Sequence, residues 1–159
     1  LADEPTTALD ATVQIQILLL LRELQRELGL SVVFVTHDIG AAVEVADRIA
    51  VMYAGRIVEE GPAATLLRAP RHPYTLALLK SRADGALAKG TRLETISGSP
   101  PDLTALPTGC AFAARCKMAQ PACEATRPEI TWLEAGHSVR CLRVADTATA
   151  TPTATPVTV

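Results

Sequence analysis

The sequence predicts the closing half of an α/β domain followed by a small Cys-rich extension. Three observations support this fold class. Helix and strand patterns alternate over residues 1–61, glycine and proline interrupt the chain after that point, and all four cysteines lie between Cys110 and Cys141. The 159 residues, 48% apolar and 20% charged, are enough to bury a core.

The first elements form an alternating series. Residues 11–28 carry good helix formers, with Asp10 placed to cap the start of a helix and Gly29 placed to end it. Residues 31–36 are β-branched and apolar, which predicts a buried, parallel strand. A short helix is expected over residues 39–46.

A hairpin and a less regular region follow. Two strand-like runs within residues 48–61 flank Ala54 and Gly55, which predicts a β-hairpin. Helix, strand, helix and hairpin in this order indicate the end of an α/β domain. Residues 64–81 read as two short helices separated by prolines, and residues 90–109 as loop.

Composition and charge argue against a polyanionic partner. The formal net charge is −2, and no run of Lys or Arg suggests a nucleic-acid or membrane-surface patch. The longest apolar run near the start, residues 17–21, is far shorter than the roughly 20 residues of a membrane span. There is no signal-peptide pattern and no initiator Met, so we expect the C-terminal part of a longer cytosolic chain.

Three side chains near strand ends have the chemistry to act on a phosphate. An Asp ending a buried strand can hold Mg²⁺, and an adjacent Glu can polarise a water for attack; Asp3 and Glu4 fit these roles. His37 follows the next strand and is expected at the same sheet edge, where it could contact a terminal phosphate. Taken singly, these residues also fit a solvated turn and an idle helix cap.

A family resemblance joins these residues. "LADEPTTALD" resembles the Walker B and D-loop segment of ABC-transporter nucleotide-binding subunits. "VFVTHDIGAAVEVADRIAVMYAGRIVEEG" resembles their switch-histidine segment and closing hairpin. The likeness covers residues 1–67 and implies the C-terminal half of a P-loop NTPase (ABC ATPase) domain.

The resemblance implies ATP and Mg²⁺ as cofactors and a role for each candidate residue. Asp3 would belong to the magnesium shell, Glu4 would be the catalytic carboxylate and His37 the switch histidine. Asp10 would lie in the D-loop between two ATPase subunits. The chain contains no G-x-x-x-x-G-K-[ST] phosphate cradle, Q-loop or LSGGQ-like signature. We therefore expect an ATPase only as a complete chain, and no activity from these residues alone.

The four cysteines, Cys110, Cys116, Cys123 and Cys141, have the spacing C-x5-C-x6-C-x17-C, without the close C-x2-C pairs typical of structural zinc. Four thiolates could hold a [4Fe–4S] cluster or a zinc ion, form two disulfides, or remain free. Because this segment has few large apolar residues, we expect a cross-link to order it. His137 is a spare ligand candidate, although a turn before a strand also explains it.

The C-terminal part resembles one branch of the ABC family. "APRHPYTLALLKS" is similar to the extension that follows the ATPase domain in oligopeptide and dipeptide importers. "GCAFAARCKMAQPACEATRPEI" and "GHSVRCL" are similar to their Cys-rich region. That resemblance implies an iron–sulfur cluster, with Zn²⁺ as the alternative. Arg115, Lys117, Arg127 and Arg140 could offset its charge or be ordinary surface charge.

The expected organisation is a nucleotide-binding part at 1–67, an importer-type extension with the Cys cluster at 68–143, and a disordered Thr/Ala/Pro tail at 144–159.

The resemblance implies the ATP-hydrolysing subunit of an oligopeptide or dipeptide importer, peripheral on the cytoplasmic membrane face. Its partners would be a second ATPase subunit, permease subunits and, indirectly, an extracytoplasmic solute-binding protein, but no nucleic acid. The alternatives are an ABC-type ATPase of nucleic-acid metabolism and a non-enzymatic, metal-stapled regulatory module. The solute stays open among nickel, short peptides and longer peptides.

Overall fold

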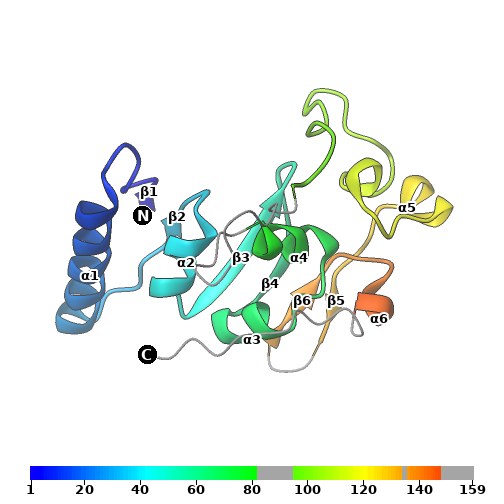
Figure 1. The fold of residues 1–159 in the computed structure, drawn as a ribbon. Coiled ribbons are helices and arrows are strands. Elements are labelled where there is room, and N and C mark those ends of the chain that lie inside the picture. Colours follow the sequence, from blue (N-terminus) through cyan, green and yellow to red (C-terminus); the bar gives the residue numbers. More distant parts are fainter. Residues whose placement is uncertain (82–94, 134–135, 148–159) are drawn as a thin grey trace, which may run out of the picture. The chain divides into compact units, whose positions relative to one another are not determined.

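The computed structural model describes residues 1–81, 95–133 and 136–147. The chain forms two compact units, Leu1–Asp47 and Arg48–Val159 (Figure 1). The boundary therefore lies before the hairpin, whereas the sequence suggests one after residue 67. The difference arises because the hairpin pairs with a strand from the Cys-bearing region.

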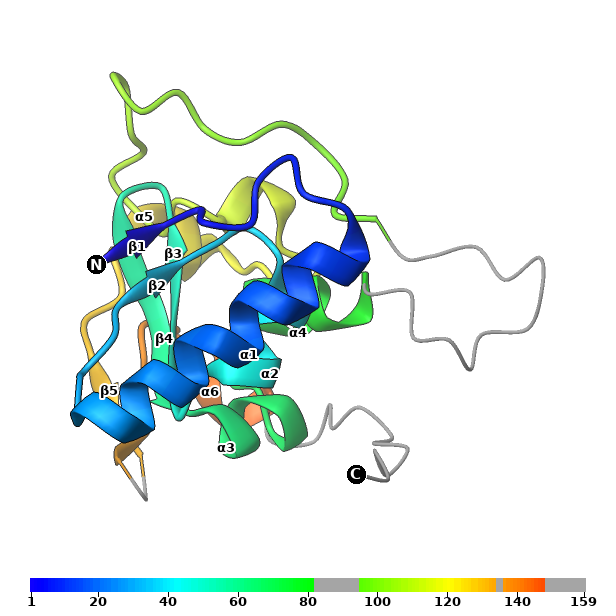
Figure 2. The ribbon, with the colours of Figure 1, turned by 90° about the vertical axis from the view of Figure 1, so that its left-hand side faces the viewer.

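The first unit combines a small parallel sheet with two helices. Strand β1 (Ala2–Asp3) pairs in parallel with β2 (Phe34–Val35). Helix α1 (Ala11–Leu28) contacts α2 (Ile39–Val45), and Figure 2 gives a side view of α1. The predicted order of helix, strand and helix is confirmed.

Local signals set the helix limits, whereas the strand differs from its prediction. Asp10 accepts hydrogen bonds from the first turn of α1, and Gly29, with φ of 63°, ends the helix as predicted. The predicted strand at 31–36 is parallel but shorter, and it is not buried, since Val33 is 63% exposed. A two-stranded sheet gives each strand only one neighbour, which explains the difference.

The second unit is built on a four-stranded antiparallel sheet. Its strands are β3 (Arg48–Tyr53), β4 (Arg56–Pro62), β5 (Thr131–Trp132) and β6 (Ser138–Val139), in the order β3-β4-β6-β5 (Figure 1). The β3–β4 hairpin is confirmed. It turns at Ala54 and Gly55, whose φ values of 48° and 75° are the left-handed pair that a tight two-residue turn requires.

Two short helices follow the hairpin, as predicted, and short helices that the sequence did not predict follow in the Cys-bearing segment and after it. They are α3 (Ala63–Arg68), α4 (Pro73–Lys80), the 3₁₀ turn η1 (Ala113–Arg115), α5 (Pro121–Ala125) and α6 (Val144–Thr147). Among the described residues, no helix has the length and apolar character needed to cross a membrane.

Helix α6 corrects the predicted start of the disordered tail. Thr147 is buried, and its hydroxyl donates to the Arg71 and Val144 carbonyl oxygens at 2.9 Å each. These contacts order residues 144–147. The rest of the predicted tail, 148–159, lies outside the described residues.

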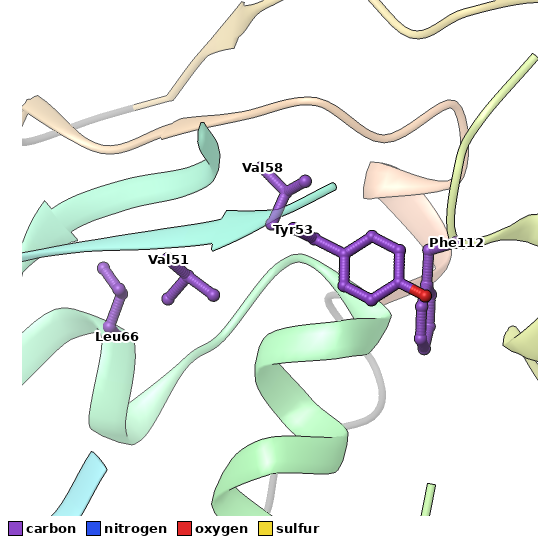
Figure 3. Packing of buried hydrophobic residues seen from close by; sticks show 5 residues of the cluster. All are labelled: Val51, Tyr53, Val58, Leu66 and Phe112. Carbon is purple, nitrogen blue, oxygen red and sulfur yellow. The ribbon is translucent and has the colours of Figure 1, made fainter. Parts of the chain in front are cut away.

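The core of the second unit joins segments that are distant in sequence. Val51, Tyr53 and Val58 of the hairpin pack with Leu66 of α3 and with Phe112 of the Cys-bearing segment (Figure 3). The Phe112 ring centroid lies 5.3 Å from that of Tyr53, in an edge-on arrangement. The Cys-bearing segment is thus anchored by apolar packing, whereas its sequence predicts that a cross-link orders it.

Candidate functional site

Glu4 and His37 meet at one edge of the small sheet. Parallel pairing of β1 with β2 brings the ends of both strands together, and the Glu4 N–H donates to the Val35 carbonyl at 2.9 Å. Glu4 Oε1 then lies 2.9 Å from His37 Nδ1, while Thr7 Oγ1 donates to Glu4 Oε2 at 2.9 Å. As the sequence predicts, the two side chains share this edge.

The backbone on each side of the pair is held by local hydrogen bonds. Glu4 has φ of 44°, a region that residues with a Cβ adopt rarely, and its carbonyl accepts from the Thr7 N–H at 3.1 Å. Next to His37, Asp38 caps α2 by accepting from the Gly40 N–H at 2.7 Å. Gln14 of α1 also donates to Asp38, at 3.3 Å, which ties α1 to the turn that carries His37.

The pair is electrostatically complementary. The hydrogen bond with His37 lowers the pKa of Glu4, with a further contribution from Thr7, and the hydrogen bond with Glu4 raises the pKa of His37. Both side chains are exposed, so solvent screens their attraction. The charged pair is complete above the lowered pKa of Glu4 and below the raised pKa of His37, and is lost outside that window.

Replacing Glu4 with Gln is expected to lower the pKa of His37 back toward its ordinary value of 6.5, because the neutral amide no longer stabilises the imidazolium. An NMR pH titration of the His37 ring measures this change. Glu27→Gln, at the end of α1, is the matched control and should leave His37 unchanged. An equal His37 pKa in the wild type and Glu4→Gln would show that the contact does not persist in solution.

The two candidate aspartates have different surroundings. Asp3 ends β1, and its side chain makes no hydrogen bond or ion pair with any described residue, which leaves both oxygens available. Mg²⁺ in nucleotide sites is typically held by one or two carboxylates, waters and substrate phosphates, so Asp3 fits such a site. Asp10 instead uses Oδ1 to accept from Thr12 and Val13 at 3.0 Å each. Its observed contact is the cap of α1.

All four cysteines are free thiols in the second unit. Burial, together with the charges of Cys110, Cys116 and Cys123, raises the pKa of Cys141 to about 11. The ionisation of Cys141 is therefore influenced by the charges of the other three cysteines. Within the described ranges, no group of three or more His, Cys, Asp or Glu is arranged to hold a metal ion. The predicted metal site is thus not a preformed ligand set among these residues. Buried thiols stay protonated, whereas the thiolate is the form that binds a metal.

Backbone donors and one arginine surround the sulfurs. The Met118 N–H donates to Cys116 Sγ at 3.4 Å, and the Arg143 N–H to Cys141 Sγ at 3.3 Å. Burial raises the pKa of Cys116, while the charge of Arg143 opposes this. Arg115, predicted to be cluster-facing or solvated, instead donates to the Ser97 carbonyl at 3.0 Å. Arg143, which the sequence did not single out, is therefore a cation close to Cys116 and Cys141.

Sequence reasoning missed the buried carboxylate of Glu59, which is 1% exposed in β4. It accepts from the backbone N–H groups of Arg71 at 2.6 Å and His72 at 2.9 Å, and from His137 Nε2 at 2.7 Å. His137, predicted as a spare metal ligand, is bound to Glu59 instead. The available signal was the adjacent pair Glu59 and Glu60, because neighbouring side chains of a strand point to opposite faces.

Comparison with known proteins relates this chain to one group of proteins. Residues 58–123 match the family model for the oligopeptide/dipeptide transporter C-terminal region. A putative peptide import ATP-binding protein of Brucella ovis is 50% identical over 148 residues, covering 90% of this chain and 44% of that protein. The dipeptide transport ATP-binding protein of Bacillus subtilis is 48% identical over 143 residues, 89% of this chain and 42% of that protein.

The oligopeptide transport ATP-binding protein of Bacillus subtilis is 51% identical over 119 residues, which cover 75% of this chain and 33% of that protein. The chain thus spans less than half the length of the relatives it matches, 44%, 42% and 33% of these three.

Proposed function

We propose that this chain acts in the ATP-hydrolysing subunit of an ABC importer for oligopeptides or dipeptides, because most of its length is similar to part of the peptide-import ATP-binding proteins. The observation that carries the proposal is the meeting of Glu4 and His37 at one sheet edge, 2.9 Å apart. A carboxylate and an imidazole in contact are suited to handle a water and a terminal phosphate.

In this proposal Glu4 polarises the water that attacks the γ-phosphate of ATP. His37 orients the Glu4 carboxylate through Nδ1 and contacts the terminal phosphate when ATP is bound. Thr7 fixes the second carboxylate oxygen. Asp3 would hold Mg²⁺, which neutralises charge on the β- and γ-phosphate oxygens. Asp10 contributes by starting α1 and so shaping the loop between two ATPase subunits.

The hydrolysing unit would be a pair of such subunits, identical or related, bound to permease subunits at the cytoplasmic face of the membrane. A solute-binding protein outside would deliver the solute to the permease. The relatives' printed names, all of peptide transport, favour this function over nucleic-acid metabolism and over a non-enzymatic module. Deleting the coding sequence should abolish uptake of labelled di- or oligopeptides while sparing free amino acids. Unchanged peptide uptake would contradict the proposal.

We further infer that the four cysteines hold a [4Fe–4S] cluster. The proposal is supported by the Cys110 N–H, which donates to the Cys123 carbonyl at 2.8 Å, and by backbone N–H groups directed at Cys116 and Cys141. Hydrogen bonds to ligand sulfurs are typical of iron–sulfur sites. A single zinc ion would need all four sulfurs about 2.3 Å from one point, whereas a cluster is larger and takes thiolates spaced farther apart.

Anaerobically purified protein is expected to contain about four iron and four sulfide per chain, and Cys141→Ser to lose most of both. Ala114→Ser, which adds a hydroxyl in the same segment and removes no thiol, should keep the metal. The measurement is metal analysis with acid-labile sulfide. About one zinc per chain without sulfide would contradict the cluster and support the zinc site. The absence of metal from the wild type would contradict both proposals.

A further inference from the structure

The second unit contains a cavity that is separate from the Glu4–His37 pair. Its volume is about 40 Å³, enough for a few water-sized groups. Apolar side chains, among them Val58, Leu106 and Phe112, form part of its lining. Of the four cysteines, only Cys110 lines it. The cavity is therefore adjacent to the Cys region and does not coincide with it.

Positive charge gathers at this cavity. Arg56, Arg127 and Arg140 line it, and no Asp or Glu is among its described lining residues, although the chain as a whole carries a formal net charge of −2. Because Arg56 and Arg127 are exposed while Val58 and Phe112 are buried, the cations lie on the solvent side of an apolar interior. This arrangement favours an anion with an apolar portion.

The arginines keep donors available. The Arg56 side chain makes no hydrogen bond or ion pair with any residue in the described ranges. Arg127 uses one guanidinium nitrogen, which donates to the Pro107 carbonyl at 3.0 Å. Arg140 lies 3.8 Å from Glu129, too far for a hydrogen bond, and the Glu129 side chain is 91% exposed.

A buried histidine completes the lining. His72 is 1% exposed, and its Nδ1 accepts from the Tyr74 N–H at 3.1 Å. Burial lowers the pKa of His72 to about 4, so the ring is neutral near pH 7 and its proton is on Nε2. The cavity thus combines an uncharged imidazole N–H with three permanent charges.

We propose that this cavity binds a small organic carboxylate that carries a short apolar group. The planar guanidinium fork matches a carboxylate in two parallel hydrogen bonds, and the apolar lining accepts the hydrocarbon. The same chemistry belongs to a free short-chain acid and to the C-terminus of a short peptide. The inference does not depend on the proposed transport function, because it concerns a different set of residues.

The test is isothermal titration calorimetry on the reduced, full-length protein with isovalerate, isovaleramide, the dipeptide Ala-Leu and inorganic phosphate. Isovalerate is expected to bind, and isovaleramide, which lacks the charge, about tenfold or more weakly. If Ala-Leu binds with an affinity comparable to that of isovalerate, the carboxylate is the C-terminus of a short peptide. If Ala-Leu does not bind, the carboxylate belongs to a free short-chain acid. Each result supports a carboxylate site.

Arg56→Gln and Arg127→Gln are each expected to weaken isovalerate binding about tenfold. Arg68→Gln, an exposed arginine at the end of α3 that does not line the cavity, is the control and should bind as the wild type does. Thermal unfolding shows that each variant is folded, and the Arg56 side chain has no hydrogen bond or ion pair with a described residue to lose. Equal binding of acid and amide, tighter binding of phosphate, unchanged affinity in both arginine variants, or no binding up to about 10 mM would each overturn the proposal.

Discussion

Replacing Glu4 with Gln in the full-length protein is expected to slow ATP hydrolysis by about 10²- to 10⁴-fold while ATP still binds. The amide has nearly the shape of the carboxylate but cannot polarise the attacking water. It would also lose the ionic contact with His37, which lies 2.9 Å away. Phosphate release gives the rate, and equilibrium binding of a labelled nucleotide gives the affinity.

The same measurements on Glu27→Gln control for a general effect of removing an acid from this unit. That variant should hydrolyse ATP at the wild-type rate. If Glu4→Gln turned over within about twofold of the wild type, Glu4 would have no part in the reaction. If both affinity and rate collapsed, the residue would be acting on nucleotide binding.

Replacing Glu59 with Ala is expected to destabilise the second unit by about 3–5 kcal/mol, because one buried partner of a pair is removed. Its carboxylate accepts from His137 at 2.7 Å and from the backbone of Arg71 and His72. All three donors would lose their acceptor, and those of His72 and His137 would remain buried. Urea unfolding followed by near-UV circular dichroism measures the loss.

Glu60→Ala is the matched control in the same strand. Glu60 pairs with Arg48 at 2.8 Å, but the two side chains are 41% and 50% exposed, so the expected cost is about 1 kcal/mol or less. Equal losses for the two variants would show that the buried network around Glu59 does not hold the extension to the hairpin.

Features fixed by neighbouring residues are predictable from the sequence. The limits of α1 follow from Asp10 and Gly29, and the hairpin turn from Ala54 and Gly55, because each device acts within a few residues. The meeting of Glu4 with His37 is predictable as well, since parallel strands end at a common edge.

Features that depend on distant pairing are not predictable in this way. Glu59 and His137 are 78 residues apart in the sequence, and no local pattern predicts their contact. The same holds for the packing of Phe112 on the hairpin, which moves the boundary between units. A metal-ligand prediction from cysteine spacing alone also fails to specify whether the sulfurs converge before a metal is bound.

The most direct test of the central claim is peptide accumulation in membrane vesicles that contain the full-length protein with its permease partners. With ATP on the side of the ATPase subunits, the account predicts uptake of a labelled dipeptide by the wild type and none by Glu4→Gln. Uptake that needs no ATP, or that persists in Glu4→Gln, would contradict the assignment of this chain to an ATP-driven peptide importer.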